Sequence, residues 1–283
     1  MKTASAELLE PVADLRIRRG FDPVALTALA VLTLRQNLRG RRLLVLSLLF
    51  LLPVVLVGVV KLVPFPPTSQ ELEFAFIFNL IPHALAPLTA LLYAAGIVQD
   101  EVEEQTLTYL LLRPLPRWAL YITKLAVTWL TTSVLTGVFT TLTLVVLYWK
   151  TPELWGDIVP GRAAKIAALM ALAQVGYCAL FGVLGLLTRR SLIAGLAYII
   201  AFEGLLANFD LVVRRLTVMF YFRVLSVRWL DPSKRDEWSI DLTTAPSVRE
   251  CIVTLLAASA VFVLWGAVMM MQREFRMKTA AGS

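Results

Sequence analysis

The sequence predicts an all-α polytopic membrane protein, with six transmembrane helices preceded by an N-terminal interfacial helix. Two features of composition support this class. Of the 283 residues, 58% are hydrophobic and 17% are charged, whereas soluble domains contain about 45–50% apolar and about 25% charged residues. A third observation is that mostly apolar runs of about 18 residues or more recur, and each can cross a hydrocarbon layer of about 30 Å as a helix.

Residues 1–40 are expected to form a cytoplasmic tail and an interfacial helix. Asp22 followed by Pro23 is a typical helix start, with an N-cap and a proline at the first helical position. The apolar part from Val24 to Leu34 would be about 16 Å long, too short to span. It continues into polar residues from Arg35 onward. We therefore expect this helix to lie in the membrane interface, with a corner at Gly40.

The transmembrane domain is expected over residues 41–272, and residues 273–283 form a second tail. A cytoplasmic loop, 99–118, and a long outer segment, 210–247, interrupt it. The predicted spans are 43–61, 74–98, 119–149, 163–187, 192–209 and 248–271.

The basic residues predict the orientation. Placing both termini in the cytoplasm puts most Arg and Lys residues of the short loops on that side, as the positive-inside rule requires. The outer segment 210–247 contains Arg214 and Arg215, but long loops follow the rule weakly. The net charge of +7 is scattered around apolar segments, where Lys and Arg set the membrane topology. Binding of nucleic acid would require a soluble basic face, so no nucleic-acid partner is expected. We expect the chain in the cell (inner) membrane, with the lipid bilayer as its surroundings.

The densest acidic cluster lies in the loop QDEVEEQTLTYLLLRPLPRW, residues 99–118. Asp100, Glu101, Glu103 and Glu104 precede a leucine-rich turn and two prolines flanked by arginines. Carboxylates have little effect on topology, and a boundary function would not require the leucine-rich turn. Exposed apolar residues beside paired charges are typical of a docking surface. Charges that only cap the membrane boundary are the alternative.

This loop resembles the corresponding loop of ATP-binding-cassette (ABC) type-2 transporter permeases. That pattern contains acidic residues, Gly-Thr-Leu, a leucine-rich turn, a Pro-x-x-Arg-like element and a lysine that opens the next helix. The matching positions are Glu101, Glu104, Thr106, Leu107, Pro114, Arg117 and Lys124, while Gln105 stands where the family usually has glycine. The interfacial helix is similar to the family's connecting (elbow) helix. The resemblance covers nearly the whole chain and is strongest to small permeases linked to multicopper-enzyme maturation.

The resemblance implies an exporter permease subunit that binds a separate ABC ATPase and pairs with a second copy or a similar permease. The implied coupling residues are Asp100, Glu101, Glu103, Glu104, Thr106, Leu110, Leu111, Leu112, Arg113, Pro114 and Arg117. None of the 14 glycines precedes a lysine, so the sequence contains no GxxxxGK[ST] phosphate loop. We expect no catalytic residue, cofactor or metal in this chain, and ATP and Mg²⁺ on the partner.

Two groups of polar residues are candidates for a translocation path. Glu203 would lie about 17 Å into the fifth predicted span, and an intramembrane acid is a functional candidate by default. A shallower span with Glu203 at the surface, or a protonated Glu203 bonded to a neighbouring helix, is the alternative. Thr128, Thr132, Thr136 and Thr140 recur every four residues on one helix face. For these hydroxyls we favour bonding to their own helix, or helix packing, over a path lining.

Other features leave the function open. His83, the single histidine, lies between Pro82 and Pro87, where we expect it to hydrogen-bond at a proline-loosened turn. By resemblance, short re-entrant helices would occupy Leu205–Trp229. The competing classes are an ATP-independent transporter or channel that uses Glu203, and a non-transporting membrane scaffold.

Overall fold

The computed structural model describes residues 23–97, 116–151, 153, 155–156, 158–188, 190–205, 212–232, 235–238, 240 and 243–272. Every regular element within these ranges is helical. Five helices are long and apolar enough to cross a membrane, and a sixth, Ser191–Leu205, is shorter. The five are α3 (Arg41–Val60), the continuous helix Ser69–Ala94, α8 (Arg117–Leu147), α9 (Ile158–Leu187) and α12 (Val248–Gln272). The all-α polytopic class is therefore confirmed, while the count of six spans stays a prediction.

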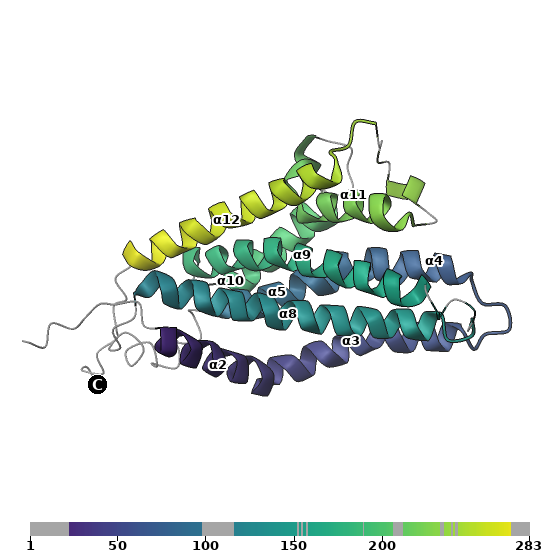
Figure 1. Ribbon diagram of the computed structural model, residues 1–283, viewed down its shortest axis with the longest axis horizontal. Coiled ribbons are helices and arrows are strands. Elements are labelled where there is room, and N and C mark those ends of the chain that lie inside the picture. Colours follow the sequence, from purple (N-terminus) through teal and green to yellow (C-terminus); the bar gives the residue numbers. More distant parts are fainter. Residues whose placement is uncertain are drawn as a thin grey trace, which may run out of the picture.

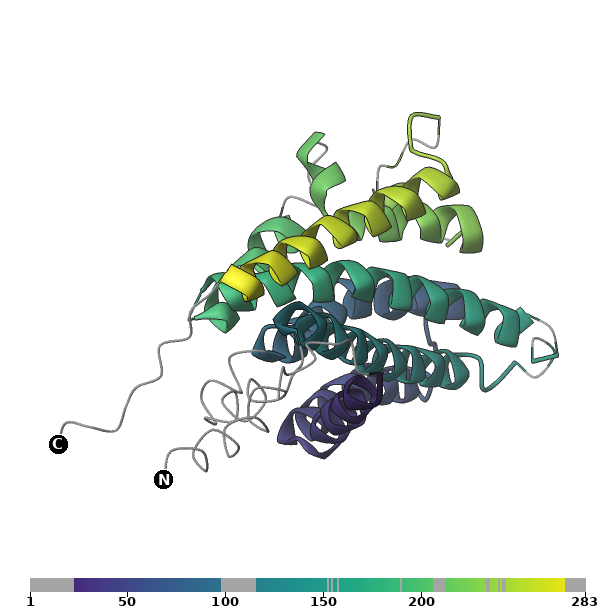
Figure 2. The same ribbon diagram turned by 60° about the vertical axis from the view of Figure 1, so that its left-hand side comes forward.

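Two helices form the centre of the bundle. Figure 1 shows α8 and α9 in the middle, with α2 (Pro23–Arg39) and α3 on one side and α11 (Val218–Leu230) and α12 on the other. The view in Figure 2 agrees with this arrangement. In the most apolar stretch of α9, 67% is buried inside the bundle. In the corresponding stretches of α3 and α12, only 28% is buried. The outer helices therefore present apolar side chains, such as Leu48 and Leu264, to the lipid or to another protein.

The helix Ser69–Ala94 contains a long π-helical stretch. It consists of α4 (Ser69–Glu73), the π-helix η1 (Phe74–Leu85) and α5 (Ala86–Ala94). Pro82 and Pro87 lack the amide hydrogens that regular helical bonding would need. Side chains bond to backbone carbonyls nearby: Asn79 Nδ2 donates to Phe74 O at 3.3 Å, and Gln174 Nε2 donates to Ala86 O at 3.0 Å. Such bonds satisfy a loosened backbone within a membrane.

The chain after α9 forms short helices. These are α10 (Ser191–Tyr198), the π-helix η3 (Ile199–Leu205), the 3₁₀-helix η5 (Val212–Leu216), α11 and the 3₁₀-helix η6 (Arg235–Trp238). At 1.5 Å per residue, α11 is about 20 Å long, too short to span. It nevertheless has most of its side chains buried against the bundle. Short helices between the fifth and sixth apolar segments are thus present, and their re-entrant path through a membrane stays a prediction.

The N-terminal helix α2 begins at Pro23, and Gly40 separates it from α3. Gly40 has an extended backbone, with φ −71° and ψ 147°, and Figure 1 shows a bend between α2 and α3. The side-chain Nδ2 of Asn37 donates to Thr131 Oγ1 at 3.3 Å, and the hydroxyl of Tyr93 donates to the backbone O of Asn37 at 3.2 Å. Helix α2 therefore packs on α8 and α5, and its interfacial position stays a prediction.

Candidate functional site

Most residues of the predicted coupling loop lie outside the described residues, including the acidic cluster Asp100–Glu104, Thr106, Leu110–Leu112, Arg113 and Pro114. Arg117 is described, and it opens α8 directly after the N-cap Pro116. Lys124, two turns further on, is buried with 4% of its surface exposed. The structure therefore shows only the last residues of the predicted coupling loop, at the start of α8.

The threonine face of α8 is buried within the bundle. Thr128 and Thr140 are 1% exposed, and Thr132 and Thr136 are fully buried. Thr136 Oγ1 donates to Thr132 O at 2.9 Å, and Thr140 Oγ1 donates to Thr136 O at 2.6 Å. The Thr132 hydroxyl donates to Trp129 O at 3.0 Å. These contacts are those of the packing interpretation, and a role in a translocation path stays a prediction.

Glu203 is fully buried in η3 and is bonded to the start of another helix. Its Oε1 accepts from the amide of Val218 at 3.2 Å, and its Oε2 accepts from the amide of Met219 at 3.1 Å. The hydroxyl of Tyr198 also donates to Oε1, at 3.3 Å. Of the alternatives considered for Glu203, a surface position does not agree with this burial, and its partners are the first two amides of α11 and the Tyr198 hydroxyl.

His83 joins η1 to the middle of α11. Its Nδ1 lies 3.2 Å from Asn79 O, and its Nε2 lies 2.8 Å from Nη2 of Arg223. A carbonyl can only accept and a guanidinium can only donate, so the ring carries its proton on Nδ1. The Arg223 guanidinium carbon also lies 5.6 Å from the ring centre of Trp238, whose Nε1 donates to Asn79 Oδ1 at 3.2 Å. The predicted bond at the proline-loosened turn is thus present, together with a partner that the sequence did not indicate.

A second buried acid, Glu73, was missed from the sequence. It is 1% exposed, forms an ion pair with Arg162 of α9 and accepts from the Tyr148 hydroxyl at 2.7 Å. Arg162 also donates to Leu230 O at 3.0 Å. Glu73 and Arg162 each stand one residue before a predicted span. A charge at such a position is usually interpreted as marking the membrane boundary. Their opposite charges at the same end of two neighbouring helices were the available signal.

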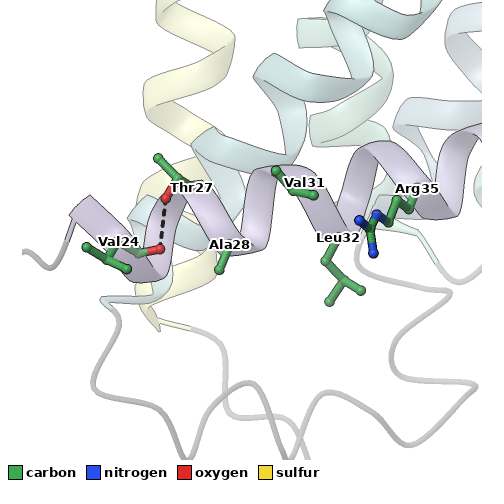
Figure 3. Close-up of a pocket in the computed structure, with 6 residues that line it drawn as sticks. All are labelled: Val24, Thr27, Ala28, Val31, Leu32 and Arg35. Carbon is green, nitrogen blue, oxygen red and sulfur yellow. Dashed lines mark hydrogen bonds between the residues drawn. The ribbon is translucent and has the colours of Figure 1, made fainter.

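Figure 3 shows a shallow groove along α2. Its lining residues are Val24, Thr27, Ala28, Val31, Leu32 and Arg35. The Thr27 hydroxyl bonds to Val24 O at 2.9 Å, so Arg35 supplies the available polar group. Among the described residues, no three His, Cys, Asp or Glu side chains gather closely enough to hold a metal ion. The buried polar groups around α11 are therefore taken as the candidate site in the described part of the chain.

Comparison with known proteins identifies the family. No curated protein matches the chain. A family model described as "ABC-2 family transporter protein" matches residues 27–275, which include all the helices described above except the first turn of α2. The chain therefore belongs to the ABC-2 transporter family and is a multi-pass membrane permease component of an ABC transporter.

Proposed function

We propose that this chain is the permease subunit of an ABC exporter, driven by a separate ATPase that binds the loop 99–118. The observation that carries the proposal is the family match over residues 27–275. It is supported by the absence of a GxxxxGK[ST] phosphate loop from the 283 residues. The ABC-2 family implies a partner ATPase in general, and the acidic loop is the segment that resembles its docking site.

The ATPase is proposed to contact both the charges and the leucines of this loop. Glu101, Glu103 and Glu104 would line one side, with Arg113 and Arg117 on the other. The leucines Leu110–Leu112 would enter an apolar groove of the partner. Because α8 begins at Arg117 and packs on α9 and α12, a force on the loop would reach the central helices directly.

A second copy of the chain, or a similar permease, is proposed to complete the translocation path. The apolar surfaces of α3 and α12 are extensive, with Leu44 73% exposed and Val261 63% exposed. Surfaces of this kind fit either lipid or a second permease. The outward direction of transport and the pairing follow from resemblance to the family.

Charge reversal in the loop tests the coupling proposal. Glu101→Lys combined with Glu104→Lys should abolish co-purification of the ATPase, because like charges facing a basic partner surface cost several kcal/mol. The single change Glu104→Ala should weaken binding only slightly, since rim pairs add little affinity. Membrane insertion should persist, because carboxylates contribute little to orientation.

A matched control keeps the charge change and moves it to another part of the chain. Asp236→Lys combined with Glu237→Lys alters two exposed acids of η6 and should leave ATPase binding intact. Co-purification and transport-coupled ATP hydrolysis are measured on the co-expressed complex. If the loop mutant binds and couples like the control, the acidic cluster only caps the membrane boundary. Transport that persists without any ATPase would instead favour the ATP-independent class.

A further inference from the structure

Helix α11 is held at its two ends by charged side chains that belong to other helices. It is a short helix, and its buried residues contact α9, α12 and η1. Its N-terminal amides face Glu203 of η3, and its C-terminal carbonyl faces Arg162 of α9. The contacts at the two ends differ in geometry.

At the N-terminus, one carboxylate accepts from two successive amides. The amides of Val218 and Met219 have no partner within α11, as the first amides of any helix do not. Glu203 accepts from each with a different oxygen, at 3.2 and 3.1 Å. The N-cap residue, Thr217, accepts from the amide of Phe220 at 3.2 Å. The first three amides of α11 are therefore all bonded, two of them by an acid from another part of the chain.

At the C-terminus, the positive partner is Arg162. Its Nη1 donates to Leu230 O at 3.0 Å, one residue before Asp231, whose positive φ of 45° ends the helix. The guanidinium is oriented by Glu73, which is bonded in turn to Tyr148. The arginine therefore contacts the last carbonyl of α11 while its own charge is paired.

The two charges match the helix dipole, which is positive at the N-terminus and negative at the C-terminus. We propose that Glu203 and Arg162 are positioning residues: a pair of end caps that hold α11 in its buried position. Both Glu203 oxygens accept hydrogen bonds from protein groups, and the proposed role is a positioning role, distinct from the proton or ion site considered for this residue. It concerns the packing of α11 and does not depend on how the ATPase binds.

Two buried serines provide a reporter and its control. Ser226 in α11 is fully buried and donates to Phe222 O at 2.7 Å, and Ser259 in α12 is 3% exposed and donates to Leu255 O at 2.7 Å. Each serine is replaced by cysteine in the full chain, in a background without the two native cysteines. The rate of reaction with a small methanethiosulfonate reagent is measured on the purified protein in lipid nanodiscs.

Removal of either end cap should expose α11 selectively. Glu203→Gln and Arg162→Gln should each speed modification of the cysteine at Ser226 by about tenfold, the scale of a charge–dipole contact in a partly buried position. The cysteine at Ser259 should be unaffected. In the double variant the two factors should multiply, because each cap contributes separately to one opening equilibrium. Glu250→Gln, which neutralises an exposed carboxylate at the start of α12, should leave the rate at Ser226 unchanged.

Three results would overturn the proposal. The rate at Ser226 could stay unchanged in both single variants, or it could rise no more than the rate at Ser259, or Glu250→Gln could raise it equally. If a glutamine variant fails to fold, Tyr198→Phe and Tyr148→Phe remove one hydroxyl donor from Glu203 and from Glu73, respectively. These milder changes must still accelerate modification at Ser226 more than at Ser259, or the end caps do not hold α11.

Discussion

The contact of Tyr121 with two glycines predicts an ordered set of stability changes. Tyr121 of α8 is fully buried. A Cβ atom added at Gly182 of α9 would lie 2.8 Å from its hydroxyl oxygen, and one at Gly266 of α12 would lie 2.5 Å from it. Contacts this short must displace the ring, and overpacking of this kind costs about 1–3 kcal/mol. Gly182→Ala and Gly266→Ala should therefore each lower the midpoint of thermal unfolding.

Removal of the hydroxyl should separate the two positions. At Gly182 the remaining near atoms are Leu125 Cδ1 at 3.0 Å, the end of a flexible side chain, and Tyr121 Cζ at 3.7 Å. At Gly266 the ring atoms Cζ and Cε1 remain at 2.7 and 2.8 Å. Tyr121→Phe should thus restore stability to Gly182→Ala and leave Gly266→Ala destabilised. By itself Tyr121→Phe should cost little, because the hydroxyl has no hydrogen-bond partner in the described structure.

Thermal unfolding of the purified full chain, followed by size-exclusion chromatography after heating, gives the measurement. Gly161→Ala is the matched control in α9, since a Cβ there meets no atom within 4 Å. Gly161→Ala should be neutral or slightly stabilising, because glycine within a helix is less favourable than alanine by about 0.5–1 kcal/mol. Equal rescue of both glycine variants by Tyr121→Phe, or rescue of neither, would refute the contact geometry.

Two further predictions concern topology and transport. Cysteines introduced at Thr68 and Asp236 should react with an impermeant reagent in intact cells, whereas one at Gln105 should not, in a background without native cysteines. Strong external labelling at Gln105 would remove the basis for ATPase docking. Glu203→Gln should impair transport while the ATPase still co-purifies, because α11 and not the loop 99–118 is disturbed. Wild-type transport in this variant would show that the Glu203 bonds do not matter for activity.

The long helices could be predicted from the sequence because hydrophobic length has a direct physical meaning in a membrane. The expected spans 119–149 and 248–271 agree with α8 (Arg117–Leu147) and α12 (Val248–Gln272) to within a few residues. The fifth apolar segment was less predictable. Hydropathy does not register a π-helix such as η3, nor the tertiary bond that Glu203 makes to residues 15 and 16 positions further along.

The burial of charged side chains could also be predicted only in part from the sequence. The sequence made Glu203 a candidate for an intramembrane acid, since it lies inside an apolar run, but left a surface position open. Glu73 and Arg162 stand at the ends of such runs, so their burial depends on how two helices are aligned side by side. The pairing of His83 with Arg223 joins residues 140 positions apart. Contacts at this separation follow from the packing of helices, which no local pattern specifies.

The arrangement of these polar groups bears on where a substrate could pass. Within the described part of the chain, Glu203, Arg162 and Arg223 contact helix ends or other side chains around α11, and the threonines of α8 bond to their own backbone. Polar groups used in this way offer few free donors or acceptors to a substrate inside one copy. A path between two copies, bounded by the exposed helices, requires none of these bonds to break. The internal bonding of a single chain therefore supports the proposal that two permeases together form the translocation path.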